Sequence, residues 1–432
     1  MRLNTNLITR WMFCYCGWII GLANVYAFVM PVHVEAQIAV RGKVIYTMAG
    51  EPIRDGVILI RDGKIASVAP ASEVTIPDDF QVIEGTIVTP GLIDAHATVG
   101  LTGIYNQSHD QDHRESSAPI QAELRALDAI NVREQLIEYL RGLGVTTVHT
   151  GHSPGELISG QTLVMKTVGN TIEEATLVES AAVVATLGPS ANRSGGSPGT
   201  RGKQMAMLRQ ELIKAQEYLA KQEKRSSNGN DGSAENADNP SANPITRDLR
   251  LEALARVLKR ELPLLVTANR AQDISSALRL ANEFNFMLWL DGAAESYLLI
   301  DEIRDAKVPV FLHPSMIRTA GEYENLSFET GAKLADAGIP VLMQSGFEGY
   351  VPKVRVVLFE AAILAANGMT FEQALATITR DAARILGLAD RIGTLRVGLD
   401  ADIAVFDGDP FEYTTKCHSV IINGRVVSIE PR

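Results

Sequence analysis

Short apolar segments alternate with helix-like segments over most of this chain, and the alternation restricts the folds that it can adopt. The clearest apolar segments, each rich in Val, Leu, Ile or Phe, cover residues 145–148, 264–267, 286–290, 308–312 and 340–343. The stretches between them carry apolar residues at the spacing of an α-helix. Strands that alternate with helices in this way build parallel βα units. Over residues 87–390 the pattern favours a (β/α)8 barrel of the TIM type over an open sheet.

The two ends of the chain have a different, all-β pattern. Residues 37–86 contain short apolar runs separated by turn residues, among them Asp62-Gly63. Residues 391–432 repeat this style, with Asn423-Gly424 between two apolar runs. Both dipeptides are typical of tight β-hairpins. We therefore predict that the two end segments together form one small β-sandwich domain.

Residues 1–36 have the composition of an export signal. Arg2 and Arg10 lie in the polar start, and an apolar run covers residues 11–32. Small or apolar residues before and at Ala36 match the positions that a signal peptidase reads. We predict cleavage after Ala36 and export to the periplasm or the extracellular space. The apolar run is also long enough to span a bilayer, so an uncleaved membrane anchor is the alternative.

The charge of the chain argues against a nucleic-acid partner. The formal net charge is −11, and no block rich in Lys and Arg stands out. Binding to a phosphate backbone needs clustered positive charge. The expected partner is therefore a small-molecule substrate or a protein, with a homo-oligomer or hetero-oligomer among the protein partners.

Residues 224–246 interrupt the barrel pattern. This stretch is rich in Ser, Asn, Gly, Asp and Pro. Such a composition buries too little apolar surface to offset the entropy lost on ordering. We predict that it forms a disordered insertion on the surface of the barrel.

Residues 90–98 carry the chemistry of greatest interest. They read Pro-Gly-Leu-Ile-Asp-Ala-His-Ala-Thr, so an apolar run passes into a polar end that contains Asp94 and His96. Polar residues at the end of a barrel strand are typical of an active-site mouth. We expect His96 at the carboxyl end of the first barrel strand.

This stretch resembles the strand-one signature of the amidohydrolase superfamily, in which Pro-Gly-Leu-Ile-Asp precedes His-x-His. Residues 142–148, 160–167 and 398–403, in this order and spacing, resemble the imidazolonepropionase-like branch of that superfamily. The resemblance implies a hydrolase that acts on carbon-nitrogen bonds other than peptide bonds. It also implies one or two metal ions at the barrel mouth, where the metal activates a water molecule.

The same resemblance implies a ligand set, and most of its positions are substituted. The family uses two strand-one histidines, a carboxylated lysine or a glutamate, one histidine each from strands five and six, and a strand-eight aspartate. Here His96 matches the first ligand, whereas Thr98 and Thr267 stand at histidine positions. Asp291 lies at or next to the strand-six histidine position, and Lys166 is a candidate for the bridging lysine.

A catalytic zinc takes at least three protein ligands, which this set does not supply. We therefore expect no ancestral binuclear centre. The expected cofactor is none, or at most one divalent metal such as zinc with His96 as the only matching ligand. A relocated mononuclear site could use His149, His152 and His313 with Asp291 and Glu348, although these residues also fit the role of polar groups that contact substrate, and the histidines that of ordinary loop residues.

The candidate site residues follow from strand ends and from the family positions. Candidate catalytic residues are Asp291, Lys166 and His152, and candidate substrate-binding residues are Arg201, His313, Gln344 and Glu348. For Arg201, the alternative is an ordinary salt bridge at the start of a helix.

Two functional hypotheses follow. The first is a hydrolase of the amidohydrolase type, with a degenerate metal site and weak or no metal-dependent hydrolysis. The second is a non-catalytic amidohydrolase fold that serves as a binding or assembly partner of an active relative. Loss of ligands at strands one, five, six and eight together favours the second hypothesis as far as catalysis is concerned, because such broad loss indicates relaxed chemistry and not one substitution that is compensated locally.

Overall fold

The computed structural model describes residues 37–105, 107–228, 246–314, 319–347 and 357–428. The predicted signal over residues 1–36 and the candidate Glu348 lie outside these ranges, as does most of the predicted insertion. Helix α3 (Arg201–Asn228) continues past residue 224, so residues 224–228 are helical and the prediction of disorder is wrong for them. Within the described ranges, no helix is both long and apolar enough to cross a membrane.

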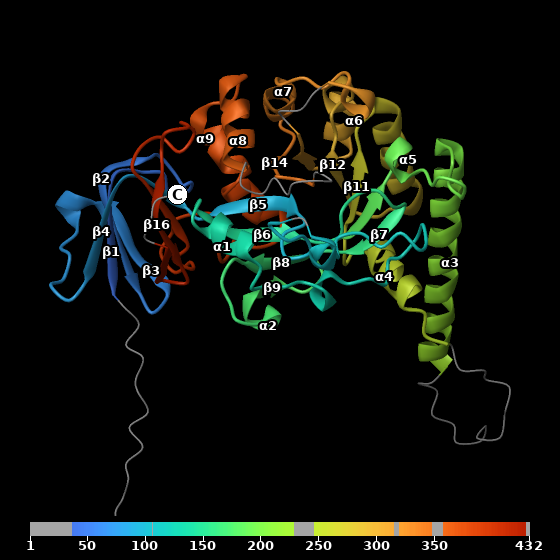
Figure 1. The fold of residues 1–432 in the computed structure, drawn as a ribbon, viewed down its shortest axis with the longest axis horizontal. Coiled ribbons are helices and arrows are strands. Elements are labelled where there is room, and N and C mark those ends of the chain that lie inside the picture. The colour runs from blue at the N-terminus through green and yellow to red at the C-terminus, as the bar shows by residue number, and fades with distance from the viewer. Residues whose placement is uncertain (1–36, 106, 229–245, 315–318, 348–356, 429–432) are drawn as a thin grey trace, which may run out of the picture. The chain divides into compact units, whose positions relative to one another are not determined.

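The two ends of the chain form one seven-stranded sheet in the order β17-β16-β15-β4-β1-β2-β3. Its strands are β1 (Ile38–Ile45), β2 (Ile53–Arg61), β3 (Lys64–Pro70), β4 (Gln81–Pro90), β15 (Ile403–Phe406), β16 (Cys417–Ile422) and β17 (Arg425–Ser428). Strands β1 and β4 are parallel, and the other neighbours are antiparallel. Figure 1 shows the blue N-terminal strands beside the red C-terminal strand β16.

This sheet folds back on itself, so that its two ends lie against each other as in the predicted sandwich. The β2–β3 turn meets the β16–β17 turn, because a Cβ atom added to Gly424 would lie 2.6 Å from the Cα of Gly63. Ala401 joins the two turns: its N–H donates to the Gly63 carbonyl at 2.9 Å, and its carbonyl accepts from the Gly424 N–H at 3.0 Å. The enclosed core contains Ile38, Val40, Ile58, Ile60, Val405 and Ile421.

The central part of the chain forms the predicted barrel. Its strands are β5 (Leu92–Ala97), β6 (Val145–Thr150), β7 (Ile158–Gln161), β8 (Leu163–Lys166), β10 (Val183–Thr186), β11 (Leu264–Ala268), β12 (Leu288–Gly292), β13 (Val310–Leu312) and β14 (Val341–Met343). Strand β9 (Thr176–Val178) pairs with β8. The segment after β14 pairs with β5 through a parallel bridge between Gly346 and Ala97, which closes the ring.

One position of the barrel runs in the opposite direction to the others. Strands β7 and β8 follow each other directly, and they pair antiparallel with β10 and β6. The register places Lys166, at the end of β8, opposite Thr147 near the start of β6. A parallel pair needs a long crossover, usually a helix, whereas no helix lies between β6 and β7. The predicted parallel order is therefore wrong at this position.

The chain passes from the sheet to the barrel at Gly91. Strand β4 continues to Pro90, so residues 87–90 belong to the terminal sheet and not to the barrel as predicted. A Cβ atom at Gly91 would lie 2.2 Å from Oγ1 of Thr146, so any side chain there would clash with β6. Glycine at this point allows the close approach of two strands that belong to different sheets.

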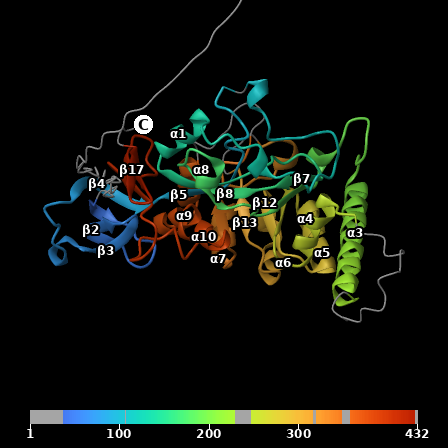
Figure 2. The same cartoon turned by 90° about the horizontal axis from the view of Figure 1, so that it is seen from below.

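Helices cover the outside of the barrel. They are α1 (Gln135–Arg141), α2 (Ile172–Ala175), α4 (Leu249–Leu258), α5 (Ala271–Phe284), α6 (Ile300–Asp305), α7 (Thr330–Asp336), α8 (Val357–Ala366), α9 (Phe371–Thr377) and α10 (Arg380–Ile385). Figure 2 shows α5, α6, α7 and α10 along one side of the strands. Inside the barrel, apolar side chains from opposite strands pack together, among them Ile93, Val164, Val184, Leu265, Phe311 and Leu342. The barrel interior is therefore a packed core, so a functional site is expected at one end of the barrel.

Candidate functional site

A cavity of about 350 Å³ lies at the carboxyl ends of the parallel barrel strands. The residues that line it from the strands or directly after them include His96, Thr98, Thr186, Thr267, Asn269, Asp291, His313 and Gln344. Connecting segments add Arg114, Pro154, Gly155 and Tyr323. Active sites of TIM-type barrels lie at this end, which makes the cavity the candidate active site.

A buried histidine–carboxylate pair forms the wall of this cavity. Nδ1 of His96 lies 2.9 Å from Oδ1 of Asp291, and both side chains are about 3% exposed. Because a carboxylate only accepts hydrogen bonds, we assign the ring proton to Nδ1 of His96. Nε2 of His96 is then the free acceptor, and this buried atom has no hydrogen-bond partner.

Two further groups hold the Asp291 carboxylate in place. Nε2 of Gln344 donates to Oδ1 at 2.6 Å, and Oγ1 of Thr267 donates to Oδ2 at 2.5 Å. Burial raises the pKa of Asp291, but the neighbouring His96 and the three hydrogen bonds outweigh it, so the pKa lies below its ordinary value. Asp291 is therefore a fixed, ionised partner for the imidazole.

A second buried carboxylate lies beneath the pair. Asp94 accepts hydrogen bonds from the backbone N–H and the hydroxyl of Ser345, at 3.0 and 2.5 Å. It also accepts a longer bond of 3.3 Å from the backbone N–H of His96. Burial raises the pKa of Asp94 to about 7 despite these bonds. Asp94 thus ties β5 to the segment that follows β14 and fixes the backbone at His96.

Two other predicted histidines lie near the mouth but do not line the cavity. Nδ1 of His149 lies 2.6 Å from the Ala95 carbonyl and Nε2 lies 2.6 Å from Oγ1 of Thr162, so both ring nitrogens are engaged. Burial and then the nearby His96 lower the pKa of His149 to about 3. His152 is buried beside Gly160, and burial lowers its pKa as well. Both imidazoles are therefore neutral at pH 7.

Lys166 lies at the opposite end of the barrel from the cavity. Its Nζ is 2.9 Å from Oδ2 of Asp400 and 3.0 Å from Oδ2 of Asp402, and it also donates to the side chain of Asn423. The reversed direction of β8 is the reason, because it carries Lys166 towards the start of β6. The predicted catalytic position of Lys166 is thus not supported: the lysine joins the barrel to the terminal sheet.

Of the remaining candidates, Arg201 does not line the cavity, whereas His313 and Gln344 do. Nε and Nη2 of Arg201 donate to Asp273 at 2.7 and 3.0 Å, which is the salt bridge at a helix start rather than a substrate contact. His313 and Gln344 line the cavity, and Nδ1 of His313 lies 3.2 Å from the Gln344 carbonyl. The structure brings together four of the predicted residues at this cavity, namely His96, Asp291, His313 and Gln344.

Two contributors to the site had no predicted role. Thr267 stood out only as a substituted ligand, although its hydroxyl holds Asp291. Arg114 lines the cavity from the segment after β5, and its guanidinium donates to the Gly155 carbonyl at 2.9 Å and to Glu156 at 3.0 Å. The ligand pattern gave a signal for Thr267, whereas no sequence pattern distinguished Arg114 from any loop arginine.

Known proteins resemble this chain in sequence and in fold. Residues 355–428 match the model of the Amidohydrolase family. The chain is 25% identical to amidohydrolase tasK of Hapsidospora irregularis over 87% of its own length, although it spans only 40% of that longer protein. It is 24% identical to imidazolonepropionase of Rhizobium rhizogenes, over 91% of this chain and 98% of the relative.

The crystal structure of an amidohydrolase from Thermotoga maritima superposes on this chain with a TM-score of 0.83 and 28% sequence identity. The match covers 91% of this chain and the whole of that structure. In sequence and in fold, the chain resembles the amidohydrolase superfamily. Among these relatives, imidazolonepropionase is similar to it over most of both chains, and the chain's TIM-type barrel with an added β domain agrees with the predicted fold.

The metal ligands that the resemblance implies can be compared with the donor atoms that this chain offers at the same positions. At the ligand positions, Nε2 of His96 lacks a partner, whereas both oxygens of Asp291 already accept hydrogen bonds. The Thr98 hydroxyl bonds to Thr102 at 3.2 Å, and the Thr267 hydroxyl bonds to Asp291. Within the described ranges, no group of three or more His, Cys, Asp or Glu side chains is arranged to hold a metal ion. These donors do not fit a binuclear centre.

Proposed function

We propose that this protein hydrolyses a carbon-nitrogen bond, other than a peptide bond, in a small molecule and does so without the binuclear metal centre. The observation that carries the proposal is the His96–Asp291 pair, with an unpartnered Nε2, at the wall of the mouth cavity. The names of the relatives, amidohydrolase and imidazolonepropionase, support this reaction class.

His96 acts as general base in this proposal. Its Nε2 takes a proton from water while the water oxygen forms a bond to the substrate carbonyl carbon. Asp291 accepts from Nδ1–H and stabilises the imidazolium that forms. The proton on Nε2 then passes to the leaving nitrogen as the carbon-nitrogen bond breaks, and His96 returns to its neutral state. General base catalysis alone contributes about 10²–10⁴ in rate, so the expected activity is weak.

Arg114 supplies positive charge to the same cavity. It is the one Lys or Arg side chain among the described residues that line the cavity. A cation near a carbonyl oxygen stabilises the negative charge that develops there during attack. The buried Glu156 partly neutralises Arg114, which again favours modest activity.

The test compares metal content with hydrolysis of a panel of amides and cyclic amides. We expect no stoichiometric metal by elemental mass spectrometry and equal activity before and after chelation. His96→Gln should lower the activity by about 10²–10⁴. His109→Gln is the matched control, because His109 is an exposed loop histidine with 78% of its side chain accessible. Activity that chelation abolishes and zinc restores would contradict the proposal.

A non-catalytic fold is the second proposal. The hydroxyls of Thr98 and Thr267 at two ligand positions favour it, because neither replaces an imidazole as a metal ligand. Under this proposal we expect no hydrolysis of any panel member and no effect of His96→Gln on hydrolysis. We also expect the protein to co-purify with an active relative or another protein partner. The same experiment therefore separates the two proposals.

We also propose that the protein is exported. This proposal rests on the composition of residues 1–36, which lie outside the described ranges. The N-terminal sequence of the protein recovered from its native compartment tests it. Cleavage after Ala36 supports a secreted or periplasmic protein, and an intact N-terminus in the membrane fraction supports the anchor.

A further inference from the structure

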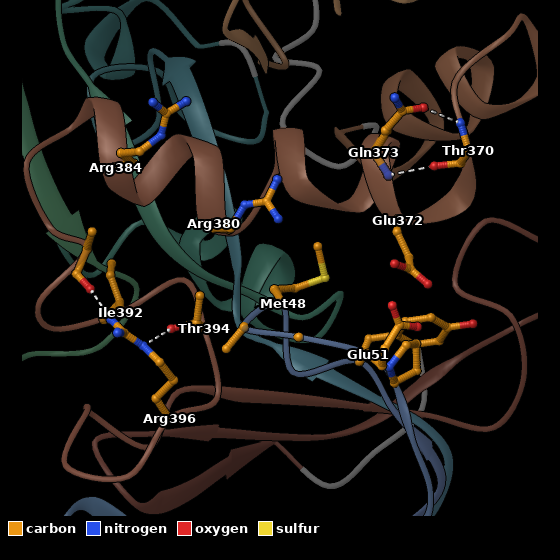
Figure 3. Close-up of a pocket in the computed structure, with 15 residues that line it drawn as sticks. Met48, Glu51, Thr370, Glu372, Gln373, Arg380, Arg384, Ile392, Thr394 and Arg396 are labelled. Atoms are coloured by element: carbon orange, nitrogen blue, oxygen red, sulfur yellow. Dashed lines mark hydrogen bonds between the residues drawn. The ribbon is translucent and has the colours of Figure 1, made fainter.

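A second and larger cavity, of about 740 Å³, lies away from the barrel mouth. It is lined by the β1–β2 connection, by the starts of α9 and α10, and by the segment that leads from α10 to β15 (Figure 3). None of its lining residues lines the mouth cavity. This second cavity therefore needs an explanation of its own.

One wall of the second cavity is basic. It carries the three guanidinium groups of Arg380, Arg384 and Arg396. Arg380 and Arg384 share a single carboxylate, that of Asp381, at 3.1 and 3.7 Å. Among the described residues, no carboxylate pairs with Arg396. The positive charge of this wall is therefore only partly neutralised by the protein.

Arg396 is fixed in place by neutral groups. Its Nε donates to Oγ1 of Thr394 at 3.1 Å, and its Nη2 donates to the Ala389 carbonyl at 3.1 Å, as the dashed lines in Figure 3 show. Neutral acceptors hold the planar guanidinium without cancelling its charge. A guanidinium that is already ordered loses less entropy when it binds a carboxylate, which strengthens the interaction.

The opposite wall is acidic. Glu51 and Glu372 both line the cavity, and Figure 3 shows them across the view from Arg384 and Arg396. Burial and then the charge of Glu372 raise the pKa of Tyr46, so the carboxylate lies near that hydroxyl. Within the described ranges neither glutamate forms an ion pair with a basic side chain. A cationic group that binds at this wall would be attracted by both carboxylates.

We propose that the second cavity binds a zwitterionic small molecule, such as an amino acid or a short peptide. Its carboxylate lies at Arg380, Arg384 and Arg396, and its ammonium group lies at Glu51 and Glu372. The charge distribution of the cavity matches a ligand with both charges, whereas a simple anion or a simple cation would satisfy only one wall. This site is independent of the reaction proposed for the barrel mouth.

Calorimetric titration of the purified full-length protein tests this inference. The probes are unbranched ω-amino acids from glycine to 6-aminohexanoate, because their rising length measures the span between the two walls. We expect the best member to bind at one site. Its N-acetyl form and its methyl ester should each bind at least about tenfold more weakly, which corresponds to ~1.4 kcal/mol.

Variants assign the binding to the second cavity. Arg396→Gln and Glu372→Gln should each weaken binding of the best probe by at least about tenfold. Arg279→Gln is the matched control and should change nothing, since this exposed arginine on α5 also donates to a neutral hydroxyl, that of Ser276. Thermal melting of each variant verifies that it is folded.

Three results would overturn the inference. The first is no binding of any probe, and the second is equal binding of the free and the blocked forms. The third is binding that His96→Gln removes while Arg396→Gln leaves it intact, because this outcome would assign the ligand to the barrel mouth.

Discussion

At the scale of single residues, the site is organised around the Asp291 carboxylate. Thr267 stands where the family places a histidine, and its hydroxyl donates to Oδ2 of Asp291. Gln344 and His96 donate to Oδ1 of the same group. A position that could have held a metal ligand thus orients the partner of His96 instead.

Thr267→Val should destabilise the fold by about 1–3 kcal/mol, because it leaves a buried carboxylate oxygen without its donor. It should also raise the pKa of Asp291, since a hydrogen bond to the charged form is lost. Urea unfolding at pH 7 measures the first effect. Thr267→Ser keeps the hydroxyl and is the control. Equal destabilisation by Val and Ser would show that packing, and not the hydrogen bond, matters at this position.

Asp94 should make stability depend on pH. Its pKa is about 7 in the folded chain, compared with an ordinary value of 3.8. The folded chain therefore holds an extra proton between these values, and the stabilisation is lost as the pH rises through about 7. Asp94→Asn should flatten the fall in unfolding free energy between about pH 4 and 7, as urea midpoints across that range would reveal.

Asp55→Asn is the control for this prediction, because the Asp55 side chain is 69% exposed. It should leave the pH dependence as it is in the unmodified protein. Equal slopes for the unmodified protein and for Asp94→Asn would mean that another group controls the pH response.

The sequence predicts site residues at strand ends more readily than it predicts the residues that form hydrogen bonds or ion pairs with them. His96, Asp291 and Gln344 could be predicted because polar residues that end apolar strands gather at one mouth. The pairing of Arg201 with Asp273 could not, since the two residues belong to different helices whose packing no local pattern encodes.

Among the secondary-structure elements, the reversed direction of strand β8 explains why Lys166 lies away from the mouth cavity. The amine lies 2.9 and 3.0 Å from the carboxylates of Asp400 and Asp402, and all three side chains are buried. Alternating apolar segments predict that a strand exists, but they do not give its direction. The direction depends on whether a helix connects it to its neighbour, and none lies between β6 and β7.

Lys166→Met should therefore cost about 3–5 kcal/mol of unfolding free energy, because it leaves the buried Asp402 carboxylate without its counter-ion. Lys64→Met is a matched control, since Lys64 also pairs with Asp400 but 52% of its side chain is exposed. The control should cost at most about 1 kcal/mol. Urea unfolding of the two variants measures both losses of unfolding free energy. Equal losses would show that the burial of Lys166 does not make its ion pairs more important for stability.

At the scale of the whole molecule, the two ends of the chain depend on each other. Strand β15 lies between β4 and β16, so the terminal sheet cannot form from either end alone. The composite domain was predictable, because matching hairpin signals occur at both ends of the sequence. Its exact junction with the barrel was not, because the apolar run through Gly91 continues from one sheet into the other.

The contact between the two end hairpins gives a test at this scale. Gly424 has a φ of +71°, and a Cβ atom there would lie 2.6 Å from the Cα of Gly63. Gly398 has a similar φ of +90° but has no atom within 4 Å of such a Cβ. Both changes to Ala introduce left-handed backbone strain of about 1–2 kcal/mol, and Gly424→Ala adds a clash.

Gly424→Ala should therefore lower the melting temperature clearly more than Gly398→Ala, because overpacking adds about 1–3 kcal/mol. Differential scanning calorimetry of the two variants measures the difference. Identical melting temperatures would mean that the two hairpins separate at little cost, and that the ends of the chain are not held together there.

The hairpin formed by β6, β7 and β8 also bears on how this protein could diversify. Its tip supplies Pro154 and Gly155 to the wall of the mouth cavity, and no helix is attached to it. Elsewhere in the barrel, a change in the length of a connection also displaces the helix that follows. Here no helix follows, and the tip is held instead by Arg114, which donates to the Gly155 carbonyl, and by Thr186, whose hydroxyl accepts from the Gly155 N–H at 2.9 Å. Substitutions at this tip can therefore reshape the wall of the mouth cavity without displacing a helix of the outer layer.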